Sequence, residues 1–217
     1  MAIKENIEEI LNSIPKSVTL VAVSKTKPEK DLQQAYDGGQ RVFGENKIQE
    51  MTQKWENLPK DIQWHMIGHV QTNKVKYMAE YVSLVHGVDS LKLLKEINKQ
   101  AKKNSRIIDC LLQVHIAEED TKFGLDETEL NDLLNSETFG KLQNIKVVGL
   151  MGMATFTEDK NQIRREFKHL KTQFNRSKET LPNIDTLSMG MSGDYQIAIE
   201  EGSTMIRIGS SIFGERN

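Results

Sequence analysis

Lys25 follows the apolar, β-branched segment 19–24 (TLVAVS), so its amine is expected at the end of a buried strand. Partial desolvation lowers the pKa of a lysine and makes its amine a nucleophile toward carbonyl carbons. Lys27 is a competitor, but it lies further from the strand, next to Pro28, and we prefer Lys25. The alternative is that Lys25 is an ordinary strand-end lysine that extends into water.

Two short segments near the C-terminus combine glycine with serine. Ser192 and Gly193 precede a predicted helix, and Gly209 and Ser210 follow a predicted strand. Free backbone N–H groups at a helix start attract anions, and glycine allows a ligand close to the backbone. Taken singly, Ser192 is more simply a helix cap and Gly209 a turn residue. If the two loops are neighbours, they predict a phosphate site.

Arg207 alternates with apolar residues in the segment 204–208 (TMIRI). An arginine that points inward needs a partner, which is either a core carboxylate or a ligand atom. A nucleophilic lysine, a phosphate cradle and an inward arginine together fit pyridoxal 5′-phosphate (PLP). Lys25 would form the Schiff base and Arg207 would face the pyridine nitrogen. Because arginine stays protonated, it would donate to an unprotonated nitrogen and weaken the ring as an electron sink.

Elements that would position these residues alternate regularly along the chain. Helices are expected at 3–11, 28–37, 47–58, 73–80, 91–103, 127–134, 159–178 and 193–201, and strands at 19–24, 41–44, 63–67, 81–86, 107–115, 146–151, 186–189 and 204–208. Eight strand–helix units, with helix 3–11 in place of the last helix, predict an α/β fold with a single (β/α)8 TIM barrel. An open doubly wound sheet is the alternative, but no G-x-G-x-x-G follows the first strand.

Composition limits the class of protein. The chain has 217 residues, which suits one domain over 1–217, and 37% of them are apolar, which is enough for a core. The net charge of −2 indicates no nucleic-acid partner, and a mean hydropathy of −0.52 indicates no membrane partner. The charged N-terminus resembles no targeting signal, and a single cysteine excludes an internal disulfide. We expect a cytoplasmic protein.

Several segments resemble the pyridoxal phosphate homeostasis protein family. They are 21–28 (VAVSKTKP), 43–46 (FGEN), 64–68 (WHMIG) with Gln71 and 73–74 (NK), 149–151 (GLM), 187–192 (LSMGMS) and 207–209 (RIG). The resemblance covers essentially the whole chain and implies the barrel of alanine racemases, of the N-terminal-domain type, without their second domain. It implies Lys25 as the Schiff-base lysine, Arg207 at the pyridine nitrogen, Ser192, Gly193, Gly209 and Ser210 at the phosphate, and Asn46 and Met153 around the ring.

The resemblance also implies a role in balancing vitamin B6 forms and amino-acid and keto-acid pools, with no established catalytic activity. PLP-dependent apo-enzymes are the expected acceptors, and a monomer is expected because no dimerising domain is added. An alanine racemase needs a second base, usually a tyrosine from a further domain, and Tyr195 is the one candidate near the predicted site. We expect Tyr195 to pack on its helix instead. The alternatives are a small PLP-dependent amino-acid racemase and a Schiff-base aldolase without a cofactor.

Other polar residues are given structural interpretations. His65 is expected to be a hydrogen-bonded core residue, and Cys110 an inert one. No metal site is predicted, because His69, His86 and His115 lack a ligand spacing. The basic helix 159–178 is interpreted as a solvated face, with a partner or nucleic-acid patch as the alternative. Lys122 is either a cation near a cofactor oxygen or part of a plain loop.

Overall fold

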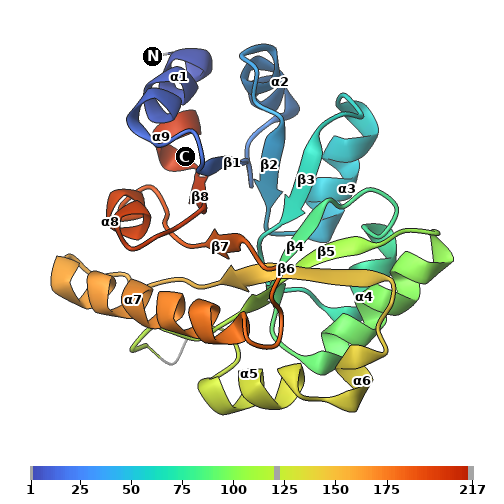
Figure 1. The fold of residues 1–217 in the computed structure, drawn as a ribbon. Helices are drawn as coiled ribbons and strands as arrows, with labels where there is room; N and C mark the ends of the chain where they lie inside the picture. Colours follow the sequence, from blue (N-terminus) through green and yellow to red (C-terminus); the bar gives the residue numbers. More distant parts are fainter. Residues whose placement is uncertain (1, 120–122, 215–217) are drawn as a thin grey trace.

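Eight parallel strands close into a barrel in the order of the sequence, with β8 paired to β1 (Figure 1). The computed structural model describes residues 2–119 and 123–214. The strands are β1 (Thr19–Val23), β2 (Val42–Glu45), β3 (Gln63–Met66), β4 (Leu84–Val88), β5 (Ile108–Gln113), β6 (Ile145–Met151), β7 (Thr186–Ser188) and β8 (Met205–Ile208). This topology confirms the predicted (β/α)8 barrel.

Helices cover the outside of this barrel (Figure 1). They are α1 (Ile3–Ser13), α2 (Glu29–Asp37), α3 (Ile48–Asn57), the 3₁₀ helix η1 (Thr72–Tyr77), α4 (Leu91–Lys103), α5 (Glu127–Leu134), α6 (Glu137–Gly140), α7 (Lys160–Ser177), α8 (Tyr195–Glu200) and α9 (Ser210–Phe213). Four of them, α4, α5, α6 and α7, begin at a side-chain cap; Asp126, for example, caps α5 through a reciprocal capping box with Glu129.

The segment before β4 differs from the prediction. The expected helix 73–80 is the shorter η1, and the expected strand 81–86 begins only at Leu84. Tyr81 and Val82 close a turn onto the Met78 carbonyl, and the Tyr81 ring stacks on Trp55 at a centroid distance of 4.4 Å. These contacts hold Tyr81 and Val82, the first residues of the predicted strand, outside the sheet.

The chain end after β8 also differs from the prediction. The short helix α9 follows β8, so α1 is added to the last unit and does not replace its helix. Figure 1 shows α1 beside α9, and the Asn6 side-chain amide donates to the Ile212 carbonyl at 2.9 Å. The two ends of the described chain are thus joined on one side of the barrel.

The apolar core has two parts, as the alternation of strand side chains requires. Outward-facing residues such as Leu20 and Ala22 pack against the helices in one large cluster. Inward-facing Val21, with Leu84, Leu111, Met151 and Met205, fills the barrel interior. Each fully buried side chain of this size contributes roughly 1.5–3 kcal/mol. A ligand site is therefore expected at the mouth of the barrel, at the carboxyl ends of the strands.

The basic helix α7 presents paired charges on its outer face. Arg164 pairs with Glu200 and Glu201, and Arg176 pairs with Glu127. These pairs agree with a solvated structural face. Across the ranges 2–119 and 123–214, no helix is both long enough and apolar enough to cross a membrane.

Candidate functional site

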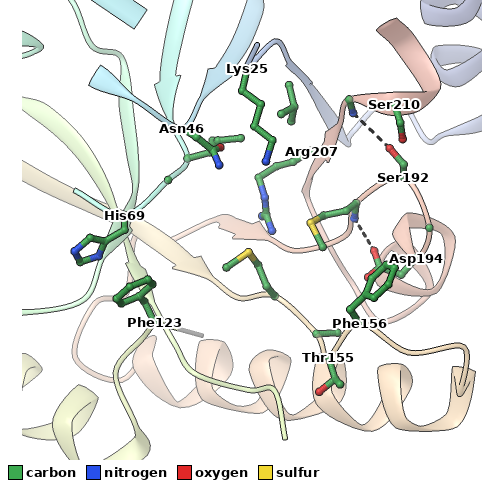
Figure 2. Close-up of a pocket in the computed structure, with 18 of the residues that line it drawn as sticks. Lys25, Asn46, His69, Phe123, Thr155, Phe156, Ser192, Asp194, Arg207 and Ser210 are labelled. Carbon is green, nitrogen blue, oxygen red and sulfur yellow. Dashed lines mark hydrogen bonds between the residues drawn. The ribbon is translucent and has the colours of Figure 1, made fainter. Parts of the chain in front are cut away.

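A cavity of about 910 Å³ opens at the carboxyl ends of the strands (Figure 2). Its lining includes all eight residues that we predicted for the site: Lys25, Asn46, Met153, Ser192, Gly193, Arg207, Gly209 and Ser210. They come from the loops after β1, β2, β6 and β7, and from β8 and the residues that follow it. Parallel strands in a closed barrel bring these distant segments to one rim.

Lys25 lies in a tight turn beyond the end of β1. The strand ends at Val23, one residue before the end of the predicted strand 19–24, so Lys25 lies in the loop that follows β1. The Lys27 amide donates to the Ser24 carbonyl at 3.0 Å, and Lys25 and Thr26 are the two central residues of the turn. Figure 2 shows the Lys25 side chain extending into the cavity toward Arg207. The turn therefore aims this side chain at the mouth of the barrel.

Lys27 also reaches the cavity lining, but it has a structural role. Its ammonium group donates to the carbonyls of Phe213 and Gly214, both at 3.0 Å. These contacts tie the β1 loop to the end of α9. A lysine engaged with backbone carbonyls is a poorer nucleophile, which argues against Lys27 as the reactive amine.

Arg207 is 4% exposed and points from β8 toward the cavity. Its Nη1 donates to the Ser188 hydroxyl at 2.6 Å, and its Nη2 donates to the Gly152 carbonyl at 3.2 Å. Burial lowers the pKa of Arg207 to about 10, and Asp194 acts in the opposite direction. No carboxylate in the described part of the chain lies within ion-pair distance of it. The core-carboxylate partner is therefore not found there.

Two buried histidines continue the hydrogen-bond chain from Arg207. Ser188 Oγ lies 3.1 Å from His86 Nδ1, and His86 Nε2 lies 3.0 Å from His65 Nδ1. Arginine only donates, so the Ser188 hydroxyl is free to donate to His86, which in turn donates to His65. Burial lowers the pKa of His65 to about 3 and holds that of His86 well below its ordinary value. Both rings are therefore neutral, and His65 is the core residue that we predicted.

The two serine–glycine loops meet, as the phosphate interpretation requires. The Gly209 amide donates to Ser192 Oγ at 3.4 Å (Figure 2). A Cβ on Gly209 would lie 3.2 Å from the Val23 carbonyl, whereas one on Gly193 would meet open space. Within the described ranges, the amides of Ser192 and Gly193 make no hydrogen bond. These donors, beside a cavity, are suited to an anion.

The helix after this loop begins later than predicted. The expected start was Gly193, but α8 begins at Tyr195, because Asp194 folds back and its carboxylate accepts from the Met191 amide at 2.6 Å. The amides near Ser192 thus belong to a turn and not to a helix start. Tyr195 is partly buried and packs against the apolar core.

Asn46 and Met153 lie on opposite sides of the cavity. Asn46 directly follows β2, and Gly68 packs so closely that a Cβ there would lie 2.5 Å from the Asn46 carbonyl. Met153 follows β6 and packs on the cluster inside the barrel. Both residues line the cavity, and their contact with a bound ring stays a prediction.

Several lining residues were not among the eight predicted for the site. His69 stacks on Phe123 at 4.2 Å and pairs with Asp89 at 3.2 Å, and Phe156 at the same rim is 95% exposed. Only the fold brings these loop residues to one place. Lys122 lies outside the described residues.

A buried carboxylate of α7 organises part of the rim. Glu166 is 4% exposed and accepts from the amides of Thr155 and Glu118, at 2.6 and 3.2 Å. One carboxylate therefore joins the loops after β5 and β6. Its position on the buried face of α7 was the available sequence signal, because acidic residues are rarely buried without a partner.

The other candidates for a reactive or metal-binding role are a cysteine, groups of possible metal ligands and a tyrosine. Cys110 is fully buried in β5, and burial raises the pKa of its thiol. Within residues 2–119 and 123–214, no group of histidine, cysteine and acidic residues is arranged to hold a metal ion. No tyrosine is among the described residues that line the cavity.

Comparisons with known proteins agree with this geometry. The family model described as "Alanine racemase, N-terminal domain" matches residues 1–217. A pyridoxal phosphate homeostasis protein of Vibrio alginolyticus is 39% identical, over 100% of this chain and 98% of its own length. Another, of Aquifex aeolicus, is 41% identical over 91% of this chain and 86% of its own.

Solved structures show the same fold. PipY of Synechococcus elongatus, solved with PLP bound, superposes with a TM-score of 0.89 at 33% identity, covering 98% of this chain and 100% of its own. An alanine racemase of Clostridium difficile has a TM-score of 0.81 at 14% identity, covering 99% of this chain but 60% of its own. The chain therefore belongs to the pyridoxal phosphate homeostasis protein family, whose barrel is that of the alanine racemase N-terminal domain.

Proposed function

We propose that this chain, acting as one domain over residues 1–217, binds PLP in the cavity and serves intracellular PLP homeostasis. The observation that carries the proposal is the convergence of three groups in one cavity: the Lys25 amine, the Arg207 guanidinium and the joined loops of Ser192 and Gly209. An amine, a buried cation without a described carboxylate partner, and unused amides suit the aldehyde, ring nitrogen and phosphate of PLP.

Each residue would have a definite role toward that ligand. PLP supplies an electrophilic aldehyde carbon and an electron-withdrawing ring. Lys25 would hold it covalently, and Ser192, Gly193, Gly209 and Ser210 would bind its phosphate. Arg207 would donate to the ring nitrogen, while Asn46 and Met153 would contact the ring. Because Arg207 keeps its proton at neutral pH even with a pKa of about 10, the ring nitrogen would stay unprotonated.

A homeostasis role without catalysis fits these features better than a racemase. The relatives named above are homeostasis proteins, and PipY was solved with PLP. An arginine partner weakens the ring as an electron sink, and the described lining offers no tyrosine as a second base. We propose a cytoplasmic monomer that passes PLP to apo-enzymes and thereby influences vitamin B6, amino-acid and keto-acid pools.

The test is a titration of PLP-free protein with PLP, followed by borohydride reduction and peptide mapping. We expect a new absorbance band that reduction removes, with the modification on Lys25. Lys25→Ala should lose the adduct, whereas Lys27→Ala should keep it. An unchanged adduct in Lys25→Ala would refute the assignment of the lysine, and no band in the natural protein would refute PLP binding. Amino-acid racemisation at enzyme-like rates would instead support the racemase alternative.

A further inference from the structure

Lys54 is a buried lysine on the apolar face of α3. It shares that face with Ile48 and Met51, and its side chain is only 5% exposed. Lysine is rarely buried unless its charge is paired. The ammonium group donates to the Ser24 carbonyl at 2.8 Å and to Oε1 of Glu45 and of Glu50, both at 2.7 Å. Its three protons therefore have three acceptors.

These acceptors connect Lys54 to both neighbours of Lys25. On one side, Lys54 binds the Ser24 carbonyl, and the Ser24 hydroxyl donates to Glu45 Oε1 at 2.7 Å. On the other side, the Thr26 amide donates to Glu50 Oε1 at 2.6 Å. The residues before and after Lys25 are thus attached to a single cluster of Lys54, Glu45 and Glu50, which we call the Lys54 cluster.

The turn that carries Lys25 needs such support. Thr26 has a φ of 64°, in the left-handed region, which a β-branched residue rarely adopts. Strained backbone persists only where surrounding contacts enforce it, and it often marks a functional site. Glu50 supplies that contact through the Thr26 amide.

The cluster is a costly way to stabilise a fold. Buried ion pairs lose much of their attraction to desolvation, and well-packed apolar residues often stabilise as well. Glu45 Oε2 also has no hydrogen-bond partner among the described residues. What the Lys54 cluster does specifically is hold the backbone on both sides of Lys25. Asn46, next to Glu45 in the sequence, lines the same cavity.

We propose that Lys54, with Glu45 and Glu50, is a positioning residue that holds the turn so that the Lys25 amine enters the cavity. That the amine captures PLP rests on the proposed function. The position of the turn does not depend on that function and can be tested in the PLP-free protein.

Limited trypsin digestion of the PLP-free full chain measures how well the turn at Lys25 is held, through the rate of cleavage there. Trypsin can cut after Lys25, whereas Lys27 is protected by Pro28. Glu50→Ala removes the acceptor of the Thr26 amide, and Glu50→Gln keeps an oxygen there as a rescue. Lys54→Met removes the centre of the cluster, and Lys95→Met makes the same change on an exposed helix position. We expect cleavage after Lys25 to be about tenfold faster in Glu50→Ala and Lys54→Met only.

A second readout is the rate of borohydride-fixed PLP capture on Lys25. We expect about a tenfold fall in Glu50→Ala and Lys54→Met, and near-natural rates in Glu50→Gln and Lys95→Met. If Lys54→Met does not fold, Glu50→Ala decides, because Glu50 is 24% exposed and its loss leaves Lys54 paired with Glu45. Cleavage and capture equal to those of Lys95→Met would overturn the proposal, as would faster cleavage with unchanged capture. If the natural protein captures no PLP, the proposed function fails, but the cleavage comparison still decides the positioning of the turn.

Discussion

Arg207 on β8 donates to the hydroxyl of Ser188 on the neighbouring strand β7 at 2.6 Å. A neutral hydroxyl thus takes the place that a carboxylate would occupy if the arginine were half of a structural ion pair. The same hydroxyl lies next to His86, so the guanidinium is held by a neutral hydrogen-bond chain. Its positive charge stays available to a ligand atom in the cavity.

Replacing Ser188 by alanine should destabilise the protein. The change leaves Arg207 Nη1 and His86 Nδ1 without their partner in a buried place, which should cost about 1–3 kcal/mol. Urea unfolding followed by circular dichroism measures this cost. Ser211→Ala, at an exposed position, is the control and should stay within about 0.5 kcal/mol of the natural protein. Equal stability of the two variants would mean that the chain through Ser188 contributes nothing.

The neutral histidine pair should make stability fall as the pH is lowered from about 6.5 toward 5. The folded-state pKa values of His65 and His86 lie below the unfolded value of about 6.5, so the unfolded state binds more protons in this range. The free energy of unfolding should drop by up to about 1.4 kcal/mol per pH unit for each histidine. Urea unfolding at several pH values gives this slope.

His86→Asn should flatten the pH slope, and His169→Asn, which replaces an exposed histidine, is the matched control. Comparing slopes between variants removes the contribution of carboxyl groups such as Glu45, whose pKa is raised by burial and whose effect has the opposite sign. An unchanged slope in His86→Asn would show that this histidine titrates alike in the folded and unfolded states.

Gly209→Ala should weaken binding of PLP more than binding of pyridoxal, which lacks the phosphate. The new Cβ would lie 3.2 Å from the Val23 carbonyl and would shift the loop joined to Ser192. Losing one hydrogen bond to a charged phosphate corresponds to about a tenfold loss in PLP affinity. Absorbance titrations with both ligands provide the ratio, and Gly140→Ala is the control because its Cβ meets open space. An equal loss for both ligands would place the phosphate elsewhere.

The Cys110 thiol should not react with a thiol reagent in the folded protein. The side chain is fully buried, and burial raises its pKa, so the reactive thiolate is scarce. Labelling followed by mass spectrometry should show no adduct in buffer and one adduct in denaturant. Rapid labelling in buffer would indicate that β5 opens readily.

Much of the fold and site follows from local pattern. Short β-type segments that alternate with amphipathic helices predict a parallel barrel, and such a barrel places the residues after each strand on one rim. That rule is why Lys25, Ser192 and Gly209, far apart in the chain, could be assigned to one site before their contacts were known. The motif resemblance added Asn46 and Met153.

Tertiary contacts decided the rest, because they join residues whose partners have no fixed spacing in the sequence. The turn at Lys25 depends on Glu50 and on the buried Lys54, which periodicity alone places on an apolar face. Whether Arg207 met a carboxylate or a hydroxyl depended on what β7 places beside β8. The local sequence therefore determines the type of each residue and its position along a strand. Burial, hydrogen-bond partners and the pKa values that they set arise only when distant segments pack together.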